Sequence, residues 1–209
     1  MEITWLGHSS FQIRNSNVTL ITDPYSSEIG FPFPDVSANV ITVSNDHPNH
    51  SSYADIKGDP RVFNGPGEYE VGGVFINSWR TLSESSEDPL NTAYLIEVDG
   101  VVICHLGDLT RNLNARLSED LGRAQVLLIP VGGYCTLALG QVAEVISQLE
   151  PKLVIPMHFK DGNSKVELEP IEPFLRELGI QEPVRQNRIT VTPASLPKEL
   201  QVIIPERKP

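Results

Sequence analysis

The order of strand and helix signals constrains the fold of this chain more than any other feature of its sequence. The first half consists of short runs rich in β-branched or aromatic residues and bounded by Asn, Gly, Pro or Ser. These runs predict strands at residues 2–6, 10–14, 18–22, 40–43, 74–77, 92–98 and 101–104. The second half alternates strands at 125–130, 153–155, 188–191 and 200–204 with helices at 113–121, 139–149 and 171–178. Strands followed by this alternation indicate an α/β fold with two sheets packed face to face and helices outside.

Size and charge limit the classes of partner. The 209 residues contain no repeat, low-complexity tract or linker, so we predict a single domain over residues 1–209. The 16 Lys and Arg against 27 Asp and Glu give a formal net charge of −11, which argues against nucleic-acid and membrane partners. No signal peptide or membrane-length apolar run is visible, and Cys104 and Cys135 make no disulfide framework. We expect a cytoplasmic protein, and the sequence leaves its oligomeric state open.

All the histidines of the chain lie beside Gly, Pro or Asn at the ends of predicted strands. They are His8, His47, His50, His105 and His158. The loops that follow strands are where such scaffolds place functional groups, and zinc combines imidazole nitrogen with carboxylate oxygen. A single histidine at a strand end is more often a surface or hydrogen-bonding residue. The shared pattern, with Asp108 three residues after His105, favours a metal site.

Six short segments, in order along the chain, carry a family resemblance. They are Ile-Thr-Trp-Leu-Gly-His-Ser-Ser-Phe at 3–11, Thr-Asp-Pro-Tyr at 22–25, Gly-Pro-Gly-Glu-Tyr-Glu-Val-Gly-Gly at 65–73, His-Leu-Gly-Asp-Leu at 105–109, Pro-Val-Gly-Gly at 130–133 and Ile-Pro-Met-His at 155–158. With them the chain resembles the metallo-β-lactamase superfamily, and within it the short bacterial Zn-dependent hydrolase-like branch related to the L-ascorbate-6-phosphate lactonases. The resemblance implies a four-layer αβ/βα sandwich.

The central metal signature of that superfamily, His-x-His-x-Asp-His, is degenerate in this chain. The matching residues 45–50 read Asn-Asp-His-Pro-Asn-His. The resemblance therefore implies ligand positions that are lost at Asn45 and Asn49, and a third lost position at Ser83. It implies that the remaining metal ligands are His47, His50, Asp108 and His158. Three losses among seven positions predict one zinc ion or none, because an amide oxygen is a poor zinc ligand and adds no charge.

Two hypotheses of different classes remain open from the sequence. In the first, one zinc ion on His50, Asp108 and His158 hydrolyses a small ester, lactone or phosphoester. His47 and Asp108 are then the expected catalytic residues, with His47 replacing the proton acceptor lost at Asn49. In the second, the chain is an inactive member of the superfamily, and its cleft binds a small ligand or a protein partner. A nuclease of the same superfamily is disfavoured by the negative charge.

A few further residues are expected to lie next to the metal ligands without binding the metal themselves. The resemblance places His8 and Asp23 near the cleft, where each can orient a ligand by a hydrogen bond or make a structural hydrogen bond within a turn. His105 is expected to point away from the metal and to have an outer role at most. Cys135 lies in a loop that would border the cleft and could ligate zinc through its thiolate, but it is expected instead to be a small buried or half-buried residue. The glycines of the 65–73 segment are expected to permit tight turns with positive φ.

Overall fold

Two sheets make up the computed structural model, which describes residues 1–81, 90–162 and 164–207. In that part of the chain, the first sheet has the strand order β13-β1-β2-β3-β4-β5. Its strands are β1 (Glu2–Gly7), β2 (Ser10–Arg14), β3 (Thr19–Thr22), β4 (Val40–Thr42), β5 (Arg61–Phe63) and β13 (Ile189–Thr190). The second sheet has the order β12-β14-β11-β10-β9-β8-β7-β6. Its strands are β6 (Gly67–Val71), β7 (Val74–Arg80), β8 (Thr92–Val98), β9 (Val101–His105), β10 (Val126–Pro130), β11 (Leu153–Met157), β12 (Val184–Gln186) and β14 (Gln201–Pro205).

The inner faces of the two sheets share one apolar core. Trp5 and Phe11 from the first sheet belong to the same buried cluster as Tyr94, Ile96 and Ile103 from the second. Each of these side chains is at most 2 % exposed, and burial of a large apolar side chain contributes about 1.5–3 kcal/mol. This contact between the sheets confirms the predicted α/β fold.

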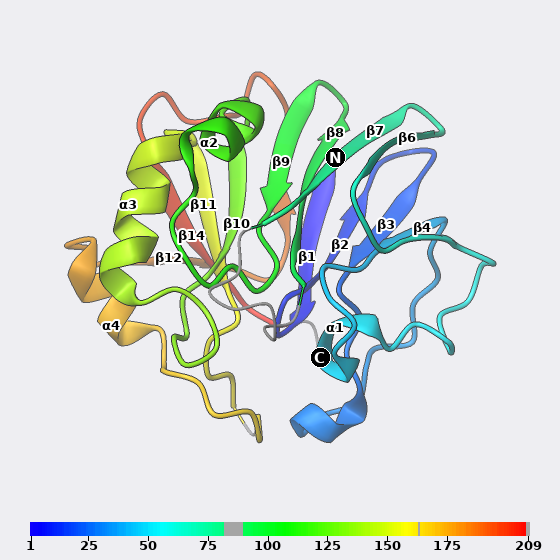
Figure 1. Ribbon diagram of the computed structural model, residues 1–209, viewed down its shortest axis with the longest axis horizontal. Coiled ribbons are helices and arrows are strands. Elements are labelled where there is room, and N and C mark those ends of the chain that lie inside the picture. The colour runs from blue at the N-terminus through cyan, green and yellow to red at the C-terminus, as the bar shows by residue number, and fades with distance from the viewer. Residues whose placement is uncertain (82–89, 163, 208–209) are drawn as a thin grey trace.

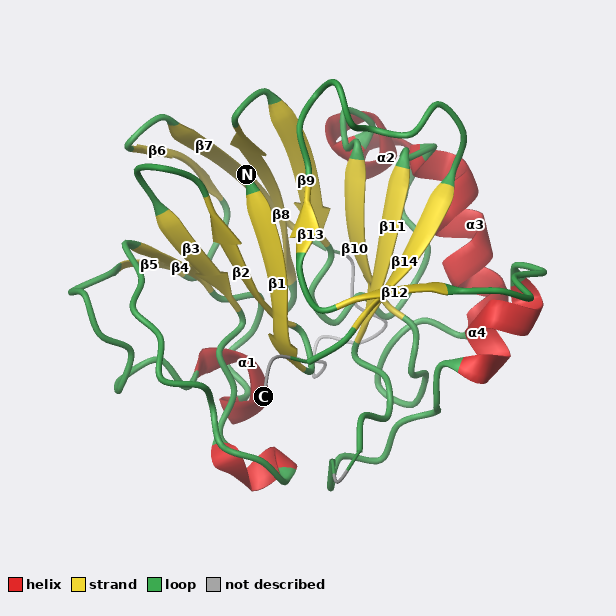
Figure 2. Ribbon diagram, turned by 180° about the vertical axis from the view of Figure 1, so that it is seen from behind, coloured by secondary structure: helices red, strands yellow, loops and turns green. Residues whose placement is uncertain are grey.

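The helices are distributed unevenly around the sheets. In Figures 1 and 2, α2 (Ala115–Leu121), α3 (Leu139–Leu149) and α4 (Glu172–Glu177) lie together on the outer side of the second sheet. Helix α3 buries Val142, Val145, Ile146 and Leu149 against it, the apolar positions from which the helix was predicted. At the first sheet, the short η1 (Ser27–Ile29) and α1 (Pro48–Ser51) lie below the strand ends in Figure 1. None of the helices in the described ranges is long and apolar enough to cross a membrane.

Several short elements were missed by the sequence patterns. They are β5, β6, β12, α1 and η1. The Gly-rich segment was expected to be a turn, but most of it is strand β6, paired antiparallel with β7. Only Gly72 and Gly73 of its glycines have positive φ, so the expectation was wrong for Gly65 and Gly67. A Cβ on Gly67 would lie 2.5 Å from the Tyr69 hydroxyl. Glycine at position 67 therefore leaves room for the Tyr69 side chain and is not needed for a positive φ.

The strand directions gather the functional loops at one edge. Strands β1, β3 and β4 run the same way, because β2 is antiparallel to both β1 and β3 and β4 is parallel to β3. Strands β9, β10 and β11 are parallel within the second sheet. The Thr92 N–H donates to the Ser44 carbonyl at 2.8 Å and joins the two sheets at this edge. The loops after β1, β3, β4, β9 and β11 therefore meet there.

Candidate functional site

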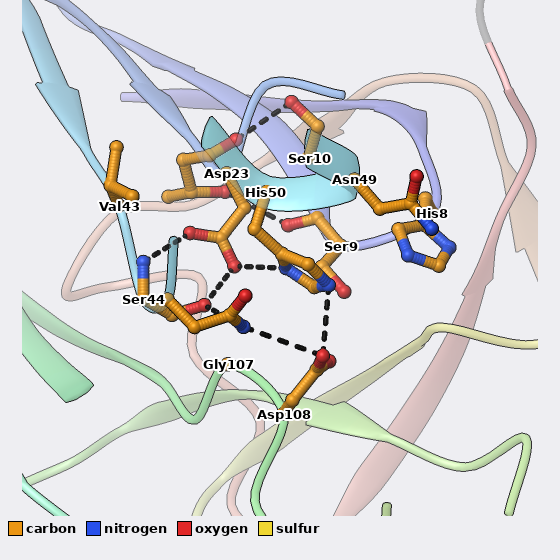
Figure 3. Close-up of polar contacts among 12 residues, drawn as sticks. His8, Ser9, Ser10, Asp23, Val43, Ser44, Asn49, His50, Gly107 and Asp108 are labelled. Carbon is orange, nitrogen blue, oxygen red and sulfur yellow. Dashed lines mark hydrogen bonds and ion pairs between the residues drawn. The ribbon is translucent and has the colours of Figure 1, made fainter. Parts of the chain in front are cut away.

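His50 lies at the centre of the site, between two carboxylates. Its Nδ1 donates to Asp23 Oδ2 at 2.9 Å, and its Nε2 is 2.9 Å from Asp108 Oδ2. Figure 3 shows the imidazole of His50 lying between Asp23 and Asp108. The ring is 1 % exposed, so both contacts are shielded from water. A carboxylate behind a histidine is the arrangement that fixes the tautomer of a metal-ligating imidazole.

Asp23 is itself held by the start of the loop after β4. The Ser44 N–H donates to Asp23 Oδ1 at 2.7 Å, and the Ser44 hydroxyl donates to Oδ2 at 2.5 Å. Asp23 has a φ of 38°, a left-handed conformation that aspartate tolerates better than most residues. The backbone after β3 is thus bent so that the carboxylate reaches His50.

Asn45 faces the site with its amide nitrogen. The His47 N–H donates to Asn45 Oδ1 at 3.0 Å, which fixes the orientation of the side-chain amide. Nδ2 therefore points at the site and donates to Asp108 Oδ2 over a long 3.4 Å. A flip that turned the oxygen toward a metal would lose the bond from His47.

His8 and His158 are brought together by backbone contacts. The His158 N–H donates to the His8 carbonyl at 3.0 Å, and the same oxygen accepts from Trp5 Nε1 at 2.9 Å. Both histidines are in the left-handed region, with φ of 51° and 52°. Gly132 lies in the loop after β10. A Cβ on Gly132 would come within 2.1 Å of the His158 carbonyl, so only glycine lets this loop approach the loop that carries His158. The ring centroids of the two histidines are 4.2 Å apart.

Three buried polar atoms of the site have no hydrogen-bond partner among the described residues. They are His8 Nε2, His158 Nδ1 and Asp108 Oδ1. Nε2 of His158 lies 3.5 Å from Asp108 Oδ1. Leaving a buried carboxylate oxygen without a donor is costly, and a bound cation would remove that cost. The residues present therefore fit a metal ion.

The charges of the site depend on burial and on Asp108. Burial alone would lower the pKa of His50, but the charge of Asp108 and the hydrogen bonds that the ring donates to Asp108 and Asp23 raise it to about 10. Burial lowers the pKa of His158, and burial with the neighbouring His158 holds the pKa of His8 well below its ordinary value. Burial would raise the pKa of Asp108, but the charges of His50 and His158 bring it far below its ordinary value. Without metal, a cationic His50 and two neutral imidazoles surround an ionised Asp108.

A cavity of about 290 Å³ opens onto these groups. It is lined by His8, Asn45, His47, Asn49, His50, Asn91, Asp108, Thr110, Cys135, His158 and Val166. Asn91 holds the Asp108 loop, because its Oδ1 accepts from the Asp108 N–H at 2.9 Å and its Nδ2 donates to the Leu106 carbonyl at 2.9 Å.

The other sequence-predicted residues lie in different positions around the cavity. His47 is exposed and caps α1, where its Nδ1 accepts from the Asn49 N–H at 3.2 Å. His105 is fully buried, and its Nε2 contacts the Ser9 carbonyl at 2.8 Å and lies 4.0 Å from Asp23 Oδ2. Ser83 lies outside the described residues.

Two groups of ligand atoms could hold a metal ion in the part of the chain that the structure describes. One contains His8, His50 and His158, and the other contains Asp108, Cys135 and His158; within each group the atoms lie within 4.8 Å of one another. Sequence reasoning gave His8 only an outer role, and Cys135 is exposed where a buried or half-buried residue was expected. The sequence feature that could have pointed to His8 as a ligand was its position directly after strand β1, which ends at Gly7. His47 belongs to neither group.

Comparison with known proteins shows the superfamily of the chain. A family model described as a β-lactamase superfamily domain matches residues 2–158. The chain is 35 % identical to a Thermotoga maritima protein assigned to the Zn-dependent hydrolases of the metallo-β-lactamase superfamily, with a TM-score of 0.85 over 99 % of both chains. The chain belongs to the metallo-β-lactamase superfamily. The predicted superfamily is thus confirmed, and the narrower resemblance to ascorbate-phosphate lactonases stays a prediction.

Further members of the superfamily are more distant. A UPF0173 metal-dependent hydrolase of Methanoculleus marisnigri is 28 % identical over 76 % of this chain and 81 % of its own length. An isothiocyanate hydrolase from Delia radicum gut bacteria has a TM-score of 0.72 over 92 % of this chain and 100 % of its own, at 12 % identity, which shows the common fold alone. The chain is therefore a hydrolase-like member of a metal-dependent family.

Proposed function

We propose that this protein is a mononuclear, zinc-dependent hydrolase of a small neutral ester or lactone. The ion is held by His50, Asp108 and His158, a set that draws on both groups of ligand atoms. Asp108 Oδ2 is 2.9 Å from His50 Nε2, and Asp108 Oδ1 is 3.5 Å from His158 Nε2. The observation that carries the proposal is the buried, unpartnered Oδ1 of Asp108, which lies beside two imidazoles that are each 1 % exposed. A cytoplasmic location, expected because two cysteines make no disulfide framework, is part of the proposal.

One ion is proposed instead of two because of Asn45 and Asn49. The Asn45 amide donates toward Asp108 Oδ2 and is fixed in that orientation by the His47 N–H. A donor N–H at this position repels a cation on the same side of Asp108. His47 has its Nδ1 engaged by the Asn49 N–H. The neutral His47 ring then carries its proton on Nε2, which leaves no nitrogen lone pair for a second ion.

The remaining chemistry is assigned to the residues around the ion. A zinc ion bound there would acidify a water molecule and polarise a carbonyl oxygen. Asp23 holds the proton on His50 Nδ1 and thereby turns the Nε2 lone pair toward the ion. His47, with Nδ1 accepting a backbone N–H, carries its proton on Nε2 when neutral, so it donates a hydrogen bond. His8 has an unpartnered Nε2 and a lowered pKa, so we assign proton acceptance to His8 instead of His47.

The substrate class follows from the cavity lining. Among the described residues that line the cavity, none is Lys or Arg, and the chain has a net charge of −11. A phosphoester would therefore bring negative charge into a cavity without a cationic side chain to pair with it. A neutral carbonyl substrate avoids that cost, and the cavity of about 290 Å³ fits a small molecule.

One observation favours the second hypothesis of an inactive protein that binds a ligand. His50, with a pKa of about 10, is a cation at neutral pH and pairs with both Asp23 and Asp108. The site can therefore balance part of its charge without any metal. The hydrolase hypothesis predicts turnover of a substrate, and the hypothesis of an inactive protein predicts none.

The test is hydrolysis by zinc-loaded protein of a p-nitrophenyl ester, a six-membered lactone and bis-p-nitrophenyl phosphate. We expect turnover of the ester or lactone that is abolished in His158→Ala and kept in Asp35→Asn, a change in an exposed ion pair with Lys57. Turnover of the phosphodiester alone would contradict the substrate class. A zinc-loaded protein that turns over none of the three would favour the inactive alternative.

A further inference from the structure

Cys135 stands out because it brings a thiol to the metal site from a separate loop. Its Sγ, Asp108 and His158 form a group in which the ligand atoms lie within 4.8 Å of one another. The residue is exposed and lines the cavity. The loop begins at Gly132, whose close approach to the His158 carbonyl sets the distance between the two segments.

The carboxylate of this group points to a cation. The Oδ1 of Asp108 is buried and has no hydrogen-bond partner among the described residues. His158 is 1 % exposed, and its Nε2 lies 3.5 Å from that oxygen. The ligand atoms of tetrahedral zinc lie roughly 3.3–3.8 Å apart, given bonds of about 2.0–2.3 Å. The atoms of Asp108, Cys135 and His158 lie within 4.8 Å of one another, so binding to one ion requires them to move closer.

Charge balance favours binding of a thiolate to the zinc ion. With neutral His50 and His158, Asp108 alone supplies one negative charge against the two positive charges of zinc. Asn45 and Asn49, the amides that also line the cavity, add none. A thiolate from Cys135 would bring the protein ligands to two negative charges, and zinc binds thiolate together with imidazole and carboxylate.

We propose that Cys135 is a thiolate ligand of the metal ion, completing a set of four with His50, Asp108 and His158. This inference rests on the proposed mononuclear site. Four protein ligands fill a tetrahedral zinc site, so in the resting state the thiolate occupies the position that the hydrolytic water needs. Turnover then requires the thiolate to leave or the ion to accept a fifth ligand. Because Cys135 is exposed on its loop, the ligand is accessible to alkylating reagents when the metal is removed.

The test uses cobalt(II) in place of zinc in the full chain. We expect visible d–d bands together with a near-ultraviolet thiolate-to-cobalt charge-transfer band in the wild type. The charge-transfer band should vanish in Cys135→Ser and persist in Cys104→Ser, the matched control, because Cys104 is fully buried on β9. In a parallel measurement, zinc should protect Cys135 from iodoacetamide, as followed by mass spectrometry.

The outcomes separate this inference from the proposed function. Visible d–d bands without the charge-transfer band, or a charge-transfer band that survives in Cys135→Ser, would overturn the thiolate ligand while the mononuclear site stands. Cobalt that does not bind to the wild type at all would overturn both. Equal alkylation of Cys135 with and without zinc would also contradict the ligand role.

Discussion

The side-chain amide of Asn45 donates toward Asp108 Oδ2 across 3.4 Å, while its own oxygen accepts from the His47 N–H at 3.0 Å. This pair of contacts turns a ligand position of the superfamily signature into a hydrogen-bond donor. It predicts that restoring ligands on this side of Asp108 restores a second metal position. The double variant Asn45→His/Asn49→Asp should bind a second ion, which inductively coupled plasma spectrometry would count.

The control for the expected gain of a second metal ion in the double variant is Asn45→Ala. It removes the donor and the bond from His47, at a cost to stability of about 0.5–1.5 kcal/mol, but it adds no ligand. Its metal content should equal that of the wild type. A double variant with no more metal than Asn45→Ala would show that the second position is lost for reasons other than these two residues.

Asp23 should support metal binding without touching the ion. Asp23→Asn removes the acceptor that fixes His50, and loss of such a partner lowers metal affinity by about 10–100-fold. Competition with a chromophoric chelator measures the change. Asp35→Asn is the matched control, since Asp35 is exposed and pairs with Lys57. Unchanged affinity in Asp23→Asn would mean that His50 is not a ligand.

Gly132 should be required for the approach of the two loops that carry His158 and Cys135. A Cβ there would meet the His158 carbonyl at 2.1 Å, so Gly132→Ala should cost about 1–3 kcal/mol through overpacking and weaken metal binding. Gly140→Ala in helix α3 is the control, because a Cβ there meets nothing within 4 Å. It should be neutral or stabilise by up to about 1 kcal/mol. Urea denaturation of both variants tests the difference, and equal stability would contradict it.

The metal-free protein should be most stable near the ordinary pKa of histidine, about 6.5. The pKa of His50 is raised to about 10, so its contribution is complete below about pH 6.5 and is lost as the pH rises toward 10. The pKa values of His8 and His158 are lowered, so their contributions are lost as the pH falls below about 6.5.

Thermal unfolding in the presence of a chelator measures this dependence. His50→Gln should remove the decline on the alkaline side and keep the decline on the acidic side. A wild type whose stability does not fall between about pH 7 and pH 10 would show that His50 is not held as a cation between Asp23 and Asp108.

Much of the fold was predictable because its elements follow simple periodic patterns. Helix α3 has the predicted bounds, and β2 and β8 match their predicted runs. The Asp99-Gly100 dipeptide joins β8 to β9 with positive φ at both residues, as its tight turn requires. The short strand β5 was missed because its three partly exposed residues carry no alternation of their own.

The sequence predicted a site residue only where that residue stands at a strand end and matches a motif of the superfamily. His50, Asp108 and His158 converge in space. The grouping of His8 with the ligands depends on its left-handed backbone and on the bond from the His158 N–H, which only the packed loops create. Cys135 comes from a loop whose path depends on Gly132 and not on any local pattern. Such long-range contacts cannot be read from residue spacing.

The number and place of metal ions in zinc-loaded crystals is the most direct measurement of the central claim. Anomalous scattering at the zinc edge should give one peak per chain, in contact with His50 Nε2, Asp108 and His158. Two peaks, with one beside Asn45 and His47, would contradict the mononuclear site. No peak at all, in protein that also holds no zinc in solution, would contradict the metal-dependent function itself.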